Sequence, residues 1–126
     1  MVLVDTSVWI SHFREGISHL IILLNNSNVI CHHFIIGELA CGNIKNRTHV
    51  ISLLNSLPKA LNVEHDEVLQ FIDNNLLMGK GLGYIDVSLL ASAALTDVPI
   101  WTLEKQLKQI ASTLALNYKF QEKDNP

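Results

Sequence analysis

The sequence lacks a long hydrophobic run, since its longest unbroken apolar segment is Leu20 to Leu24. A membrane-spanning helix needs roughly 18 such residues, so we expect no transmembrane segment and no membrane partner. The amino terminus carries Asp5 and no basic stretch before a small-residue cleavage site, which disfavours a signal peptide. Cys31 and Cys41 are the two cysteines, and they form no CxxC pair. This pattern lacks a disulfide scaffold and favours the reducing cytoplasm.

The sequence also lacks an excess of positive charge. Nine basic and twelve acidic residues give a net charge of -3. Because non-specific affinity for nucleic acid comes from many phosphate contacts, this balance disfavours a protein that holds nucleic acid by bulk electrostatics. A nucleic-acid substrate would therefore need local basic residues, each of which could equally be a solvated surface charge. The candidates are Arg14, the Lys45 to Arg47 stretch, Lys80, Lys105 and Lys108.

Several motifs of other functional classes are missing. The glycines at 79, 81 and 83 suggest a phosphate loop, but no GxxxxGK[ST] is present, so we interpret them as a hinge before a helix. Cys31, His32, His33 and Cys41 have the residue types of a zinc site. The spacing argues against zinc if His32 and His33 lie in a strand, where successive side chains point to opposite faces. Core and helix-start positions are the simpler interpretation.

What is present favours one well-packed domain. The chain has 126 residues, of which 48% are hydrophobic and 17% are charged, which suits a single core and disfavours disorder. Its mean hydropathy is +0.26. So apolar a chain favours a surface covered by a partner, although a core-rich monomer has the same composition.

Strand and helix patterns alternate along the chain. Short apolar or β-branched runs predict strands at 2–4, 29–31, 61–63, 98–102 and 116–120. Helical spacing predicts helices at 8–13 (capped by Thr6 and Ser7), 18–26, 34–40, 48–56, 64–77, 87–95 (opened by Asp86) and 104–114. This alternation predicts an α/β fold with a parallel sheet covered on both faces. We expect a single domain over 1–120 and a polar C-terminal tail at 121–126.

Four acidic residues are placed where such a sheet would bring them together. Asp5 ends the first strand, Glu104 follows the 98–102 strand by two residues, and Asp86 follows the glycine loop. Ligands bind beyond the carboxyl ends of strands in open α/β sheets, so the acids can share one cleft. Taken singly, Asp5, Asp86 and Glu104 are also explained as helix caps or first-turn acids.

Glu38 is harder to explain as a structural residue. It lies in the otherwise apolar stretch 34–40, where a buried charge without a partner would be costly. Four carboxylates in one cleft repel one another unless some protonate or a divalent cation binds. Oxygen ligands alone indicate Mg²⁺ or Mn²⁺, which can activate water for phosphodiester hydrolysis.

Four segments carry a resemblance to a known family. LVDTSVWI (3–10), GELACG (37–42), GKGLGYIDVSLLASA (79–93) and WTLEKQL (101–107) resemble the PIN-domain ribonucleases, in particular VapC-type toxins of toxin-antitoxin pairs. The resemblance extends from residue 1 to about residue 118 and agrees in motif order, spacing and length. It implies a three-layer α/β/α fold with a four- or five-stranded parallel sheet.

The resemblance also implies a site and partners. Asp5, Glu38 and Asp86 match the metal-binding acids of the family, and Thr6 or Ser7 matches a hydroxyl that assists them. Glu104 stands where the family usually has Asp, and Gln106 stands where a further acid sometimes occurs. The family implies Mg²⁺ or Mn²⁺, RNA cleavage that halts translation, homodimers, and a small antitoxin that covers the active site.

Three other functions compete with this interpretation. A phosphoacceptor signalling domain has a similar length and sheet, but it needs an adjacent acidic pair after the first strand, where this chain has Asp, Thr and Ser. A dehalogenase-like phosphatase needs Asp-x-Asp, and position 7 is Ser. A catalytically weak PIN-like domain could bind only RNA or protein, although Asp5, Glu38 and Asp86 are retained.

Overall fold

A parallel three-stranded sheet forms the centre of the fold. The computed structural model describes residues 1–120. Its strands are β1 (Val2–Val4), β2 (Val29–Ile30) and β3 (Ile100–Trp101), in the order β2-β1-β3. Leu3 pairs with Ile30 on one side and with Ile100 on the other. The parallel sheet is as the sequence predicts, and the first strand lies at its centre.

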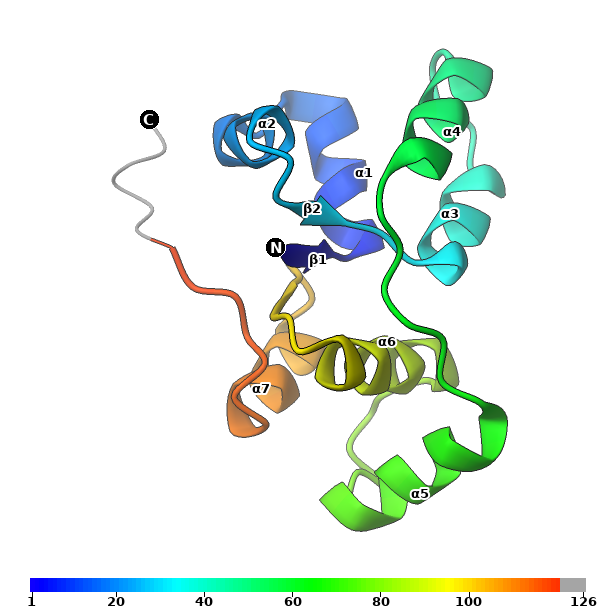
Figure 1. The fold of residues 1–126 in the computed structure, drawn as a ribbon, viewed down its shortest axis with the longest axis vertical. Helices are drawn as coiled ribbons and strands as arrows, with labels where there is room; N and C mark the ends of the chain where they lie inside the picture. The colour runs from blue at the N-terminus through cyan, green and yellow to red at the C-terminus, as the bar shows by residue number, and fades with distance from the viewer. Residues whose placement is uncertain (121–126) are drawn as a thin grey trace.

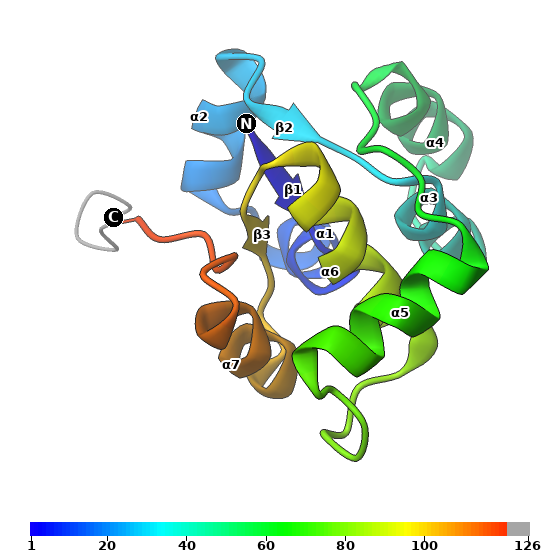
Figure 2. The ribbon, with the colours of Figure 1, turned by 60° about the horizontal axis from the view of Figure 1, so that its bottom comes forward.

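Within residues 1–120, seven helices surround this sheet. They are α1 (Thr6–Glu15), α2 (Ser18–Asn25), α3 (His33–Ala40), α4 (Arg47–Ser56), α5 (His65–Asn75), α6 (Tyr84–Thr96) and α7 (Lys105–Thr113). In Figure 1, α1 to α4 lie above the strands and α5 to α7 lie below them. Figure 2 gives the same layers from another side, with α6 in front of the sheet and α1 behind it. The fold is the expected three-layer α/β/α arrangement.

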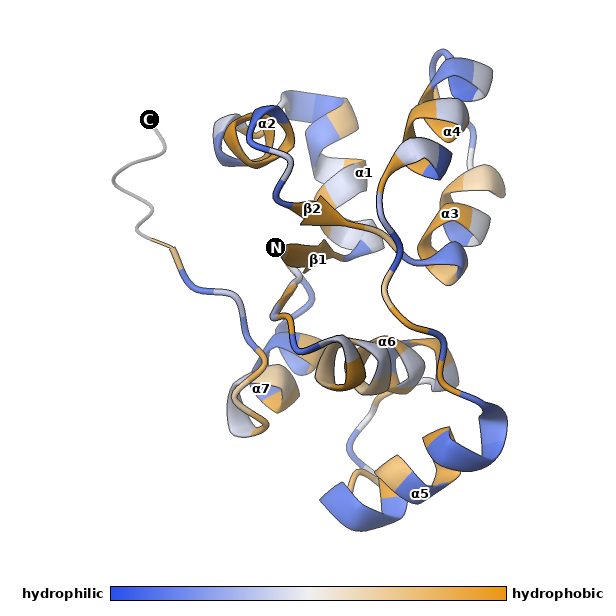
Figure 3. Ribbon diagram, viewed as in Figure 1, coloured by the Kyte–Doolittle hydropathy of each residue, from blue (hydrophilic) through white to orange (hydrophobic). Residues whose placement is uncertain are grey.

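Both faces of the sheet are buried, which explains why its strands have no polar face. All three residues of β1 are buried, and Figure 3 shows β1 and β2 as apolar segments in the middle of the molecule. Helix α6 is the main covering element on one face. Seven consecutive residues from Val87 to Ala93 are buried, so this helix is enclosed almost all round.

The sheet is smaller than the four or five strands expected. The strand predicted at 61–63 is absent, and Cys31 instead forms a single parallel bridge with Lys59. The strand predicted at 116–120 is also reduced to one bridge, between Ile100 and Asn117. Pro58 lacks an N–H and disfavours a regular ladder at the first edge. The outer positions of a five-stranded sheet are thus occupied by bridges in place of strands.

Some helix boundaries also differ from the predicted ones. Helix α6 begins at Tyr84 with Gly83 as its N-cap, so Asp86 lies inside the first turn and does not open the helix. Helix α3 begins at His33 because the His32 Nδ1 atom accepts a hydrogen bond of 3.0 Å from the Phe34 N–H. No helix within residues 1–120 is long and apolar enough to cross a membrane. The predicted polar tail, 121–126, lies outside the described residues.

Candidate active site

Asp5 stands at the carboxyl end of the central strand. Its backbone N–H donates to the Trp101 carbonyl at 2.9 Å, which ties the end of β1 to the end of β3. Its carboxylate is only 3% exposed, and it caps α1. The helix-cap explanation of Asp5 is therefore correct, and the same backbone geometry points its carboxylate beyond the sheet edge. The two explanations are compatible at this position.

The Asp5 carboxylate is held through one of its two oxygens. Oδ2 accepts hydrogen bonds from the Ser7 hydroxyl at 2.7 Å, the Thr102 hydroxyl at 2.8 Å and the Ser7 N–H at 3.4 Å. Oδ1 receives none of these three bonds. Two hydroxyl donors on one oxygen fix the rotation of the carboxylate and stabilise its charge, and Oδ1 remains available for a ligand.

Thr102 is a site residue that the sequence interpretation missed. It is 1% exposed, and its Oγ1 also accepts from the Glu104 N–H at 3.1 Å. The same hydroxyl lies 3.2 Å from Ser7 Oγ. A buried threonine at the end of a strand beside β1 could have indicated this role, because an unpaired buried hydroxyl would be costly.

Glu38 reaches the site from α3. The Thr6 hydroxyl donates to Glu38 Oε1 at 2.9 Å and so links the start of α1 to the last turn of α3, across 32 residues of sequence. The side chain of Glu38 is exposed. The argument that Glu38 carries a buried charge is therefore wrong. Its apolar neighbours Ile35, Ile36 and Leu39 face the core, and Glu38 faces outward on the same helix.

Asp86 comes to the same edge from the first turn of α6. The pKa of Asp86 is raised first by burial and then by the charge of Asp5, with a further contribution from Glu38. A hydrogen bond from the Gly83 backbone opposes this rise. Asp5 and Glu38, which come from other elements, are therefore close enough for their charges to disfavour the charged form of Asp86.

Glu104 completes the group as the N-cap residue of α7. The pKa of Glu104 is raised by burial first, then by the charges of Asp5, Asp86 and Glu38 in that order. The charges of the other three predicted acids thus all reach Glu104 at the carboxyl edge of the sheet. Its side chain makes no capping hydrogen bond, so the cap explanation does not account for its carboxylate.

The four acids influence one another electrostatically, but their side chains are not arranged as a set of metal ligands. Within residues 1–120, no group of three or more His, Cys, Asp or Glu side chains is arranged so that it could hold a metal ion. The chemistry of the donors nevertheless suits Mg²⁺ or Mn²⁺, since all four side chains offer carboxylate oxygens. Glu38 and Glu104 are both exposed.

The glycine loop before α6 is fastened to α7. Gln106 Nε2 donates to the Lys80 carbonyl at 2.6 Å. Gly79 and Gly81 have φ angles of 72° and 80°, a region that side chains disfavour. Gln106, which replaces an occasional acid of the family, therefore positions the loop that precedes Asp86. The hinge interpretation of the glycines is refined to a loop with a defined anchor.

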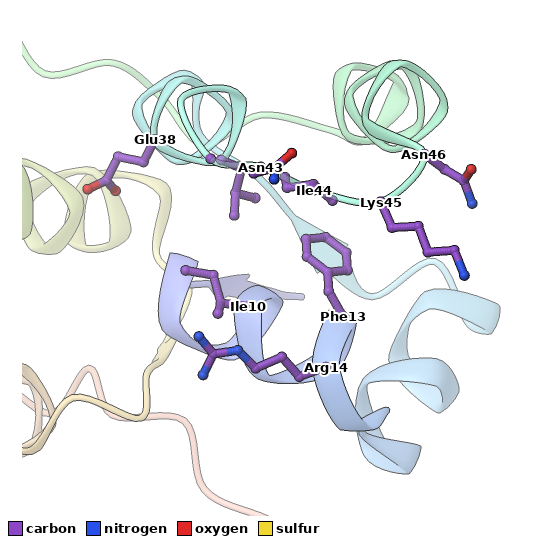
Figure 4. Close-up of a pocket in the computed structure, with 10 residues that line it drawn as sticks. Ile10, Phe13, Arg14, Glu38, Asn43, Ile44, Lys45 and Asn46 are labelled. Carbon is purple, nitrogen blue, oxygen red and sulfur yellow. The ribbon is translucent and has the colours of Figure 1, made fainter.

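The predicted basic residues separate into different places. Arg14 and Lys45 line an open groove of about 510 Å³ together with Glu38. In Figure 4, Glu38 lies at one end of this groove, and Lys45 and Asn46 lie at the other. Arg47 has a structural role, because its Nε and Nη2 donate to the Ala40 carbonyl at 3.0 and 2.8 Å.

The remaining lysines follow the acidic edge. Lys80 lies in the glycine loop, and Lys105 is the first residue of α7, directly after Glu104. Both are exposed. Lys108, one turn along α7, lines a separate pocket beside Tyr118 and Lys119.

The cysteine and histidine cluster does not form a zinc site among the described residues. Cys31 is buried and Cys41 is exposed, and both are free thiols. The expectation that His32 and His33 point to opposite faces is wrong. Their rings stack at 4.6 Å with an interplanar angle of 23°, because the chain turns into α3 at this point and does not continue as a strand.

The chain has close relatives in sequence among known proteins. No family model matches the sequence. Two curated proteins named Ribonuclease VapC32, from Mycobacterium tuberculosis strains CDC 1551 / Oshkosh and ATCC 25618 / H37Rv, are each 46% identical to this chain over 109 residues. The match covers 86% of this chain and 88% of each relative. The chain belongs to the VapC family of PIN-domain ribonucleases.

A solved structure supports the fold of this VapC-family member. The crystal structure of PAE2754 from Pyrobaculum aerophilum matches 90% of this chain and 85% of its own, with a TM-score of 0.59. The two sequences are 19% identical, so the likeness concerns the fold alone. The VapC-like segments 3–10, 37–42, 79–93 and 101–107 each contribute one of the four acids that meet at the carboxyl edge.

Proposed function

We propose that this protein is a metal-dependent endoribonuclease that acts as the toxin of a toxin-antitoxin pair and inhibits translation by hydrolysing RNA. The observation that carries the proposal is a group of acids held in place at one sheet edge: Ser7 and Thr102 hold Asp5, and Thr6 holds Glu38. The charges of Asp5 and Glu38 both reach Asp86 and Glu104, where they help to raise the pKa. The relatives named Ribonuclease VapC32 support the reaction class. RNA is proposed as the substrate on the strength of that name and the motif resemblance.

Asp5, Glu38 and Asp86, with Glu104 beside them, would hold Mg²⁺ or Mn²⁺. Such an ion supplies an activated water and neutralises charge that builds on the phosphate. Ser7 and Thr102 keep the Asp5 carboxylate in one orientation, and Thr6 does the same for Glu38. Outer partners of this kind commonly tune a site by 10 to 100-fold. Glu104, which is longer than Asp, closes the α7 side.

The basic residues would hold the RNA backbone. Arg14 and Lys45 line the groove that begins at Glu38, Lys80 lies in the loop before α6, and Lys105 is the first residue of α7. A chain with net charge -3 has little general attraction for RNA. Local contacts of this kind would therefore supply the phosphate affinity, and binding would weaken as salt increases.

A small antitoxin would cover the groove that begins at Glu38. Ile10 is 40% exposed and Phe13 is 37% exposed, and both line this groove with the acid. An apolar partner segment laid there would bury these side chains and block access to Glu38 at the same time. We propose also that the protein forms homodimers, which sedimentation analysis tests. We further propose that it acts in the cytoplasm, where free thiols such as Cys31 and Cys41 persist.

The deciding experiment measures cleavage of single-stranded RNA by the purified protein. We expect cleavage with Mg²⁺ or Mn²⁺, loss of cleavage with chelator, and loss in Asp5→Asn and Asp86→Asn. Circular dichroism of both variants shows whether the fold persists, and His49→Ala on the outside of α4 is the matched control. Cleavage that persists with chelator would exclude the proposal. So would a rate in Asp5→Asn and Asp86→Asn that equals the rate of the unmodified protein.

A further inference from the structure

A second cavity lies at the β2 end of the sheet edge. It has a volume of about 230 Å³ and is lined from three stretches of chain: residues 32–34 at the start of α3, residues 62–65 before and into α5, and Tyr84 with Ser88 on α6. Binding pockets for drug-sized ligands start at roughly 300 Å³. This cavity is therefore the size for one small group and not for a whole ligand.

Rings from separate elements line this cavity. On the α3 side, the His33 and Phe34 rings are centred 4.6 Å apart, and His33 is stacked on His32. On the α5 and α6 side, the His65 and Tyr84 rings are 5.5 Å apart. Tyr84 is 42% exposed, and His33 and His65 are also exposed. Exposed ring faces of this kind stack planar groups of any base type.

The charge of the cavity selects against phosphate. Its lining contains no lysine or arginine, and Glu64 is its one carboxylate. Burial, and secondarily the charge of His33, lowers the pKa of His32 to about 4, so this imidazole is neutral at neutral pH. With no cationic side chain for a phosphate and with the Glu64 carboxylate opposing an anion, the ring-lined cavity favours an uncharged planar group.

The cavity also offers hydrogen-bonding edges. His65 Nδ1 and the Tyr84 hydroxyl lie 2.8 Å apart. The imidazole retains its second nitrogen, and the phenol can both donate and accept, so each ring keeps one further hydrogen bond to offer. Stacking surfaces with a few polar atoms at the edge are the features by which proteins hold unpaired RNA bases.

The cavity is lined by the same two helices that carry Glu38 and Asp86. Phe34 is one helical turn before Glu38 on α3, and residues four apart lie on the same face of a helix. Tyr84 lies in the first turn of α6 together with Asp86. A strand of RNA whose phosphate is at the acids would therefore have a neighbouring nucleotide at this cavity.

We infer that this cavity is a base-binding subsite, in which His33 and Tyr84 stack an unpaired base next to the scissile phosphate and so select the cleavage site. The inference deepens the proposed function and rests on it. A stacked aromatic side chain of a protein partner would fill the same space, and that alternative is an outcome of the test.

The test measures binding, so that it does not depend on cleavage. Hexameric oligoribonucleotides that carry one abasic position, moved stepwise along the chain, are titrated by fluorescence anisotropy with Ca²⁺, which binds oxygen ligands as Mg²⁺ does. We expect one abasic position to weaken binding to the unmodified protein by about 5- to 100-fold. His33→Ala and Tyr84→Ala should weaken binding of the intact hexamer similarly and remove the effect of that abasic position.

Control variants separate stacking from folding and from polar contacts. Tyr84→Phe keeps the ring and should retain affinity while changing the preferred base, and His49→Ala should change neither. With a library of random RNA sequences, His33→Ala should broaden the set of cleaved sites. If the hexamer binds and every abasic position lowers the affinity by the same factor in all variants, the cavity holds no base and the inference is overturned. Absence of RNA cleavage together with position-specific binding would instead reject the nuclease proposal alone.

Discussion

The two corners of one sheet edge have opposite chemistry. At the corner between β1 and β3, Asp5 is buried, and its carboxylate accepts hydrogen bonds from the hydroxyls of Ser7 and Thr102. At the β2 corner, His32 is equally buried, and burial lowers the pKa of this imidazole to about 4. One corner stabilises a charge and the other excludes one. Burial by itself therefore says nothing about polarity, and the hydrogen-bond partners of each group decide it.

The largest effect should come from removing the charge at the first corner. Asp5→Asn keeps the shape of the side chain and should reduce RNA cleavage by more than about 100-fold. Residues that only support a metal ligand change activity by up to about 100-fold, and Asp5 is proposed as a ligand itself. Initial-rate assays with Mg²⁺ check this, with the fold followed by circular dichroism. An Asp5→Asn protein that cleaves RNA at the normal rate would remove the reason for distinguishing the two corners.

Acidification should act through the neutral corner. Because the pKa of His32 is about 4 in the fold and about 6.5 in the unfolded chain, the unfolded state binds the extra proton first as pH falls. The stability supplied by the neutral imidazole is complete above pH 6.5. It is lost as the pH falls from about 6.5 to about 4, by about 3 kcal/mol in total.

Urea denaturation at a series of pH values checks this contribution. His32→Asn retains a side chain that caps helices and cannot titrate, so its free energy of unfolding should fall less steeply over the same range. His49→Asn, at an exposed position on α4, is the control. Equal pH slopes for the unmodified protein and His32→Asn would contradict the role of His32.

Loss of one hydroxyl at the charged corner should have an intermediate effect. Thr102→Val keeps the shape of the side chain but removes the 2.8 Å bond to Asp5, and should reduce cleavage about 10 to 100-fold. The loss should be partly recovered at higher Mg²⁺ concentration if the bond orients a metal ligand. Thr113→Val, whose hydroxyl bonds only to the Ile110 carbonyl on α7, should leave cleavage unchanged. Identical rates for the two variants would show that the hydroxyl does not order Asp5.

The smallest effect concerns the loop that leads to Asp86. Gln106→Ala removes the hydrogen bond to the Lys80 carbonyl, which is worth about 1 kcal/mol. We expect a few-fold decrease in cleavage and faster amide exchange within residues 79–83, with little change in the melting temperature. Unchanged exchange in that loop would mean that Gln106 does not anchor it.

Much of this arrangement could be predicted from the sequence. Val2 to Val4 has no polar residue and is a strand buried on both faces. The alternation of strands and helices predicts that the sheet is parallel, as it is. Asp5 and Glu104 were placed at the carboxyl edge because each follows a strand. The outer strands were overestimated, because a short apolar run such as 61–63 does not reveal whether a neighbouring ladder extends to it.

The sequence by itself determined the residue types and the order of the acidic motifs, because strand and helix periodicity are local properties of the chain. Tertiary structure decided the rest. Only packing brings Thr102 to Asp5 across 97 residues, turns Glu38 outward from an apolar stretch, and stacks His32 on His33 at a helix start. These contacts depend on how the strands and helices are placed in three dimensions, so no local pattern of residues encodes them.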